Sequence, residues 1–131
     1  IFFFLFCNKG TLNNMMVIVY ESDEFTEYLD YETIKMSEDF NIFQVEEIVD
    51  FKTPKKLSSD KNYYSMRVTA QYDLQKKLRK STSKLACSDS MGGGTVLLQD
   101  DTKSDWEEII SNSNSDKKFE LLVRNKKIQN K

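Results

Sequence analysis

The amino-acid sequence predicts an α+β fold in which one main helix packs across a mixed β-sheet. Its 131 residues suit a single domain with its own core. Apolar and polar residues alternate over residues 63–70, which is the period of a strand with one buried face. Leucines recur over residues 74–85 at spacings that place them on one side of a helix. Strands followed by a helix in a chain of this size are typical of the α+β class.

The expected elements follow one another from residue 51 onward. A short strand beside Pro54, a turn and the alternating strand together form a β-hairpin. Asp73 then caps the helix, and a glycine-rich loop leads to a short apolar strand. An acidic turn precedes a short helix that begins near Ser104, and a last strand carries Phe119 on its buried face. In chain order these elements occupy residues 51–59, 63–70, 74–85, 95–99, 104–110 and 117–125.

Composition divides the chain into three parts. Residues 1–50 carry mainly acidic charges among scattered aromatic residues, so we expect an acidic N-terminal segment that is partly ordered or non-native at its start. Residues 51–127 are expected to form the folded domain, and residues 128–131 a tail. The apolar run at residues 1–7 is much shorter than the ~20 residues that span a bilayer, so we expect no contact with a membrane.

The residue types exclude most catalytic chemistry. The chain has no histidine, which removes histidine-dependent triads and the zinc sites built on histidine. The paired carboxylates near residue 100 stand in a polar turn, where acidic residues are usually solvated rather than catalytic. Three glycines at residues 92–94 lack the lysine that follows in a phosphate-binding loop. We therefore expect no enzyme, no metal site and no cofactor.

The two cysteines, Cys7 and Cys87, are far apart in the sequence and form no short metal-binding motif. We expect two free thiols in a reducing compartment, with a disulfide between them as the open alternative. The expected location is therefore cytoplasmic or nuclear.

Charged residues are sorted into blocks of one sign, although the net charge is only −2. A surface with two opposite poles can pair head-to-tail, basic pole to acidic pole, and such pairing can propagate into filaments. The expected basic interaction face consists of Lys52, Lys55, Lys56, Lys61, Arg67, Lys76, Lys77 and Lys80. The expected acidic interaction face consists of Asp100, Asp101, Asp105, Glu107 and Glu108.

Two other interpretations of the basic block stay open. The hairpin and helix could bind nucleic acid, although the neighbouring acidic block would repel phosphate, so direct contact with nucleic acid is the weaker alternative. The acidic residues 21–50 could also cover the basic face and so inhibit the binding of a partner.

From residue 51 onward the chain resembles the cell-death-inducing-effector N-terminal (CIDE-N) domain family. This domain occurs in the caspase-activated DNase, in its inhibitor and in the lipid-droplet CIDE proteins. The matching residues are Val68 and Ala70 at a strand end, Leu74 and Leu78 in the helix, Val96 to Leu98 in the third strand, the acidic motif at Asp100, Asp101, Thr102, Asp105, Glu107 and Glu108, and Phe119 to Val123 in the final strand.

The resemblance implies a ubiquitin-like roll with a basic and an acidic face, and a CIDE-N-like interaction domain over residues 51–127. It implies a regulatory subunit that pairs with another CIDE-N-type domain, either a second copy or a nuclease or inhibitor partner, in apoptotic DNA fragmentation. Trp106, beside the acidic block, is the expected anchor of this contact. The nuclease portion of that family needs histidines, so this chain is not the catalytic part.

Overall fold

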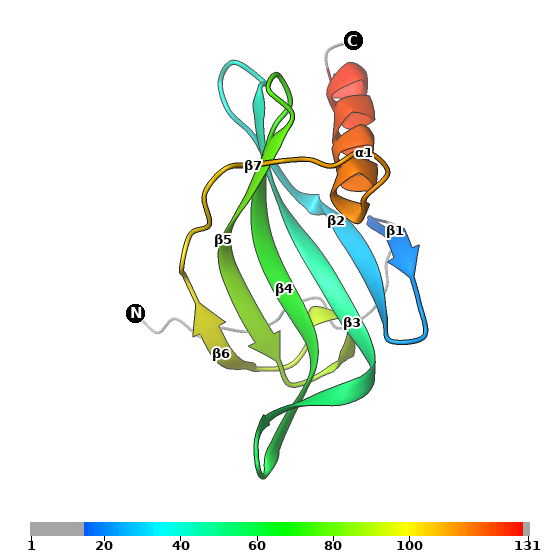
Figure 1. Ribbon diagram of the computed structural model, residues 1–131, viewed down its shortest axis with the longest axis vertical. Coiled ribbons are helices and arrows are strands. Elements are labelled where there is room, and N and C mark those ends of the chain that lie inside the picture. The colour runs from blue at the N-terminus through cyan, green and yellow to red at the C-terminus, as the bar shows by residue number, and fades with distance from the viewer. Residues whose placement is uncertain (1–14, 130–131) are drawn as a thin grey trace.

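The computed structural model describes residues 15–129, and it shows one antiparallel β-sheet and one long helix (Figure 1). The elements of the described part, in chain order, are β1 (Met16–Glu21), β2 (Phe25–Met36), β3 (Ile42–Ser58), β4 (Lys61–Asp73), β5 (Leu78–Cys87), the short 3-10 turn η1 (Ser90–Gly92), β6 (Val96–Asp100), β7 (Glu107–Glu108) and α1 (Asn114–Gln129).

Each strand from β1 to β5 pairs with the next strand along the chain. Antiparallel neighbours need only tight turns between them, so turns alternate between the two ends of the sheet. β6 pairs with the end of β5, and β7 pairs with its beginning. The segment between them follows β5, because the Ser104 amide donates to the Ser81 carbonyl over 2.9 Å. Acidic residues 100–108 therefore lie along one edge of β5.

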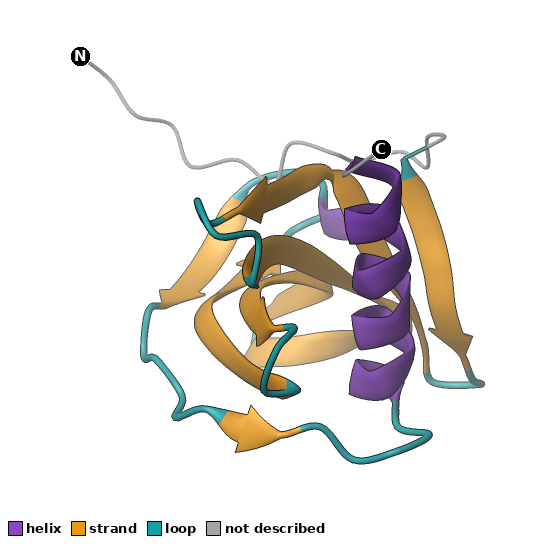
Figure 2. Ribbon diagram, turned by 90° about the horizontal axis from the view of Figure 1, so that it is seen from above, coloured by secondary structure: helices purple, strands orange, loops and turns teal. Residues whose placement is uncertain are grey.

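The sheet curves around α1, which lies against its concave face (Figure 2). Side chains alternate between the two faces of a strand, so every second residue of β2, β3 and β4 can face the helix. Phe119 and Leu122 of α1 pack there against a buried cluster that includes Leu29, Phe43 and Tyr72. Within residues 15–129 no helix is long and apolar enough to cross a membrane.

The helix expected over residues 74–85 is wrong: the chain turns at residues 74–77 and continues as β5. The Asp73 carboxylate accepts the amide protons of Gln75 and Lys76, and this arrangement stabilises a turn. Serine and threonine at residues 81–83 favour a helix only weakly. Hydrogen-bonded pairing with β4 on one side and with β6 on the other then stabilises residues 78–87 as a strand.

The two C-terminal elements also differ from the prediction. Residues 117–125, expected as a strand, belong to α1. Their apolar spacing fits both structures: Phe119 and Leu121 would share one side of a strand, whereas Phe119 and Leu122 share one side of the helix. The Ser113 hydroxyl accepts the Asp116 amide proton and caps the helix. Residues 104–110, expected as a helix, are extended and include β7.

The hairpin and the short apolar strand are confirmed, as β3–β4 and as β6. The α+β ubiquitin-like roll with a mixed sheet is wrong, because the paired strands of the described residues are all antiparallel and the helix follows the whole sheet. Residues 16–50 form β1, β2 and most of the buried half of β3, so the boundary expected at residue 50 falls inside a strand. The start of the expected acidic segment, residues 1–14, lies outside the described residues.

Candidate binding site

β3 and β4 extend past their neighbours as a two-stranded projection, here called the arm (residues 51–64), which is the lowest part of the molecule in Figure 1. Asp50 pairs with Ser65 and Lys55 with Tyr63, so residues 51–54 bulge opposite Tyr64 alone. Pro54, which has no amide proton to donate, stands in this bulge. The arm therefore bends away from the rest of the sheet.

Contacts at the base of the arm hold its direction. The Lys52 amide donates to the Glu24 carbonyl over 2.9 Å. The rings of Phe51 and Tyr63 meet edge to face at 5.7 Å between centroids. The Lys52 ammonium donates to Glu21 at 2.9 Å, and this hydrogen bond raises the pKa of Lys52 and lowers that of Glu21.

The outer part of the arm carries basic charge that the described residues do not neutralise by ion pairs. Lys55, Lys56 and Lys61 are exposed and form no ion pair with any residue of the described part. The Lys55 ammonium lies 5.3 Å from the centroid of the Phe51 ring, a cation–π contact at an exposed position. A projecting group of free ammonium groups attracts acidic partners and accelerates their association.

An apolar hollow of about 180 Å³, here called the arm groove, lies between the arm and β6. Alternation of side chains explains it, since paired residues of β4, β5 and β6 face the same side. The lining residues are Leu57, Tyr63, Met66, Ala86 and Leu98, with Lys56, Lys84 and Asp100 also in its wall.

A second hollow, of about 300 Å³, lies farther along the same face and reaches the first turn of α1. Its wall includes Glu27, Glu47, Arg79 and Lys118, which together with the buried Tyr72 form a charge cluster. Lys118 contacts both carboxylates, Arg79 contacts Glu47 at 2.6 Å, and the Tyr72 hydroxyl donates to Glu47.

These partners set the protonation of the charge cluster. Burial by itself would raise the pKa of Glu47, but Lys118 and Arg79 outweigh burial and hold this pKa below its usual value. Burial, and then the nearby Glu47 carboxylate, raise the pKa of Tyr72 well above its usual value. The two carboxylates and the two basic groups of the cluster are paired with one another. The cluster serves to attach α1 to the sheet and offers no free acid or base.

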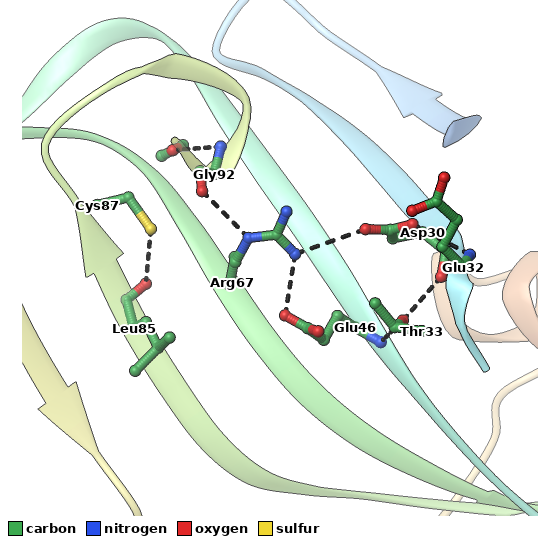
Figure 3. A network of polar contacts seen from close by, with 9 residues as sticks. Asp30, Glu32, Thr33, Glu46, Arg67, Leu85, Cys87 and Gly92 are labelled. Carbon is green, nitrogen blue, oxygen red and sulfur yellow. Dashed lines mark hydrogen bonds and ion pairs between the residues drawn. The ribbon is translucent and has the colours of Figure 1, made fainter. Parts of the chain in front are cut away.

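A second polar network, on the convex face, involves Arg67 (Figure 3). This side chain is 4% exposed; its Nη1 contacts Glu46 at 2.9 Å and Asp30 at 3.7 Å, and its Nε donates to the Gly92 carbonyl over 3.1 Å. Gly92 has φ +71°, and a Cβ there would meet Arg67 Nε at 2.8 Å. Arg67 is therefore a buried structural residue and cannot belong to a binding face.

Cys87, on the same face as Arg67, is buried and disulfide-bonded. The free thiol expected at this position is wrong. Cys7 lies outside the described residues.

The expected basic face is divided between the two ends of the sheet. Lys52, Lys55, Lys56 and Lys61 lie on the arm. Lys76 and Lys77 lie at the β4–β5 turn at the other end, where Lys77 contacts Asp116 at 3.2 Å. Lys80 of β5 lies over the Trp106 ring at 4.8 Å.

The expected acidic residues lie beside basic ones rather than on a pole of their own. Asp100 is opposite Lys84 and Glu107 is opposite Arg79 across the β5 edge. Asp101 accepts a hydrogen bond from Ser83, and Asp105 and Glu108 are exposed nearby. Trp106 is 38% exposed and contacts Lys80, so a local cation–π contact already occupies the expected anchor.

Sequence reasoning found the four arm lysines but missed the groove beside them. Met66 was expected on a buried strand face, and only the β4–β5–β6 register reveals its neighbours Ala86 and Leu98. The charge cluster was missed as well, because Glu27, Glu47 and Lys118 come from three separate elements. A glutamate alternating with buried Phe43 and Val45 was the available signal for Glu47.

Comparison with known proteins identifies the family. A family model described as surface-adhesin protein E matches residues 14–122. The chain belongs to this surface-adhesin family. No curated protein sequence matches the chain.

Solved structures of Haemophilus influenzae protein E share the fold of this adhesin-family chain. One has a TM-score of 0.72 at 11% identity and covers 90% of both chains. A second crystal form has a TM-score of 0.74 at 11% identity, covering 90% of this chain and 94% of the other. A structure of protein E from a non-typeable strain has a TM-score of 0.70 at 11% identity, covering 88% and 79%.

Membership of this family corrects the functional expectations. The resemblance to the CIDE-N domain is wrong, and with it the regulation of apoptotic DNA fragmentation, the CIDE-N-type partner and the head-to-tail pairing. The alternative of a small nucleic-acid-binding domain is also wrong. A cytoplasmic or nuclear location does not fit a family of surface adhesins. The description of the family names an adhesin.

Proposed function

We propose that this chain is a non-catalytic surface adhesin that binds macromolecules outside the cell through its arm and the arm groove. The observation that carries the proposal is the match of the surface-adhesin model to residues 14–122. The disulfide bond of Cys87 agrees with it, since disulfides persist in oxidising compartments outside the cytoplasm.

The arm supports the proposal by its position and its charge. It projects from the sheet, so a large partner can reach it without meeting α1 (Figure 1). Lys55, Lys56 and Lys61 have no ion pair with any residue of the described range that would have to break before a partner binds. In the wall of the larger hollow on this face, Glu27, Glu47, Arg79 and Lys118 are already paired with one another, so that hollow has less to offer a partner.

The arm and the groove contribute differently to binding. An exposed charge pair contributes about 0–1 kcal/mol, so the lysines mainly increase the rate of encounter. Full burial of a leucine-sized side chain contributes about 1.5–3 kcal/mol. The apolar lining of Leu57, Met66 and Leu98 can therefore supply the slower dissociation.

Binding of the purified chain to matrix laid down by cultured epithelial cells tests this proposal. The double variant Lys55→Glu/Lys56→Glu should associate about tenfold more slowly than the wild type at low salt. The control Lys35→Glu/Lys76→Glu changes the net charge equally at exposed positions near the other end of the sheet, and it should bind like the wild type. Equal loss in both variants, or no binding by the wild type, would contradict the proposal.

A further inference from the structure

We infer that the edge strand β6 accepts an extended, acidic peptide segment of a partner protein as an additional strand, with one apolar side chain of that segment in the arm groove. This inference rests on the proposed function, because it names the kind of partner that the arm and groove bind.

Among residues 15–129, β6 presents an unpaired strand edge. Four of its five residues pair with β5 on one side, and no residue of the described part forms a backbone hydrogen bond with its other side. Unpaired amide and carbonyl groups of an edge strand are a template for another strand. The opposite edge strand, β1, is different, because α1 lies beside it and polar helix residues line the hollow between the two.

The arm groove lies next to this free edge. Leu98 of β6 is 54% exposed and forms one wall of the groove together with Met66 and Ala86. An added strand would place every second side chain on the same face as Leu98. A cavity of about 180 Å³ suits one apolar side chain there, which would cover the exposed part of Leu98.

Charge gives the added segment a direction. Val96 is opposite Cys87, which in turn is opposite Ser65 at the base of the arm, so the Val96 end of β6 is the end beside the arm lysines. Asp100 and Asp101 stand at the other end. A complementary segment therefore carries its acidic residues beside Lys55 and Lys56 and has no acidic residue beside the two aspartates.

A peptide fits these features better than a sulfated glycan does. Both could contact the lysines, but a glycan would leave the strand edge and the apolar lining of the groove unused. An apolar residue flanked by acidic ones on an extended backbone satisfies all three features at once.

The test selects peptides of roughly ten residues, the length of a long strand, from a random phage-displayed library on the wild-type chain. Enriched peptides should alternate apolar and polar residues and carry acidic residues toward one end. One of them, synthesised with a fluorescent label, is then titrated by anisotropy, and binding should slow hydrogen exchange of the β6 amides.

Leu98→Lys and Ile18→Lys form a matched pair for this titration. Both residues are exposed on edge strands, at 54% and 55%, so neither change should disturb the fold. Leu98→Lys should weaken peptide binding about tenfold or more, and Ile18→Lys should leave it unchanged.

Several results would overturn the inference. The selection would fail by enriching no peptide or only peptides without acidic residues. The titration would fail if the two variants had equal effects. Matrix binding that heparin but no enriched peptide competes with, or a wild-type dimer that Leu98→Lys dissociates, would also contradict a peptide partner. If Lys55→Glu/Lys56→Glu still slows matrix binding in those cases, the proposed function survives and only the kind of partner is wrong.

Discussion

The surroundings of Arg67 and Lys52 show how the context of a basic residue decides its role. Arg67 and Lys52 both stand in the basic block of the sequence, and both contact carboxylates. Arg67 is buried between Asp30 and Glu46, whereas Lys52 and Glu21 meet in water. A buried charge that loses its partner cannot be solvated, so the two pairs differ greatly in their effect on stability.

Replacing Arg67 should therefore be costly. Arg67→Met leaves Asp30 buried without its cation, and we expect it to lower the free energy of unfolding by about 3–5 kcal/mol. Lys52→Met should lower it by no more than about 1 kcal/mol. Urea denaturation followed by circular dichroism measures both values. Similar losses for the two variants would show that Arg67 is not the buried structural residue described above.

The Glu47 carboxylate should make the free energy of unfolding depend on pH in the acidic range. Its pKa is lower in the folded chain than its ordinary value of 4.5, so its ion pairs stabilise the fold above that pH. This stabilisation is lost as the pH falls through the lowered pKa. Glu47→Gln should be less stable than the wild type at neutral pH, and its free energy of unfolding should fall less steeply below pH 4.5. Parallel pH profiles of the two proteins would contradict this assignment.

At the scale of elements, α1 determines the shape of the concave face. Its Leu122 is fully buried, and Arg124, one half-turn farther on, is exposed. Leu122→Ala should destabilise the chain by about 2–5 kcal/mol because it leaves a cavity against the sheet. Arg124→Ala should have an effect below about 1 kcal/mol. Thermal unfolding of both variants tests this difference, and a stable Leu122→Ala protein would mean that α1 contributes little to the core.

The elements that sequence patterns predict correctly are those with one dominant period. The β3–β4 hairpin has alternating Tyr64, Met66, Val68 and Ala70, and its turn residues agree with it. Residues 78–87 mislead because Leu78 and Leu85 suit a helical face as well as a strand paired on both sides. Tertiary pairing, which the local pattern does not contain, decides such segments.

Of the candidate site, only the lysines of the arm could be predicted from the sequence, and the arm groove could not. Four lysines within a short hairpin indicate an exposed basic projection, and the arm bears them. The groove depends on the register of three strands, and the separation of Lys76 and Lys77 from the arm depends on the meander. Charge blocks along a sequence therefore do not imply charge poles on a folded surface.

At the scale of the whole molecule, the sheet has a structural end and a proposed binding end. α1 and the charge cluster cover the concave face at one end, and the arm, the arm groove and β6 remain open at the other. Increasing the salt concentration should slow matrix binding of the wild type and affect Lys55→Glu/Lys56→Glu much less, because salt screens exposed charges. Biolayer interferometry at low and high salt measures these rates, and equal salt dependence would place the steering charges elsewhere.

Lysine footprinting of the wild-type chain tests the central claim most directly. The chain is acetylated free in solution and bound to epithelial matrix, and mass spectrometry then compares the modification of each lysine. We predict that bound matrix protects Lys55, Lys56 and Lys61 from acetylation and leaves the acetylation of Lys35 and Lys76 unchanged. Protection of Lys35 and Lys76 with an unprotected arm would contradict this claim.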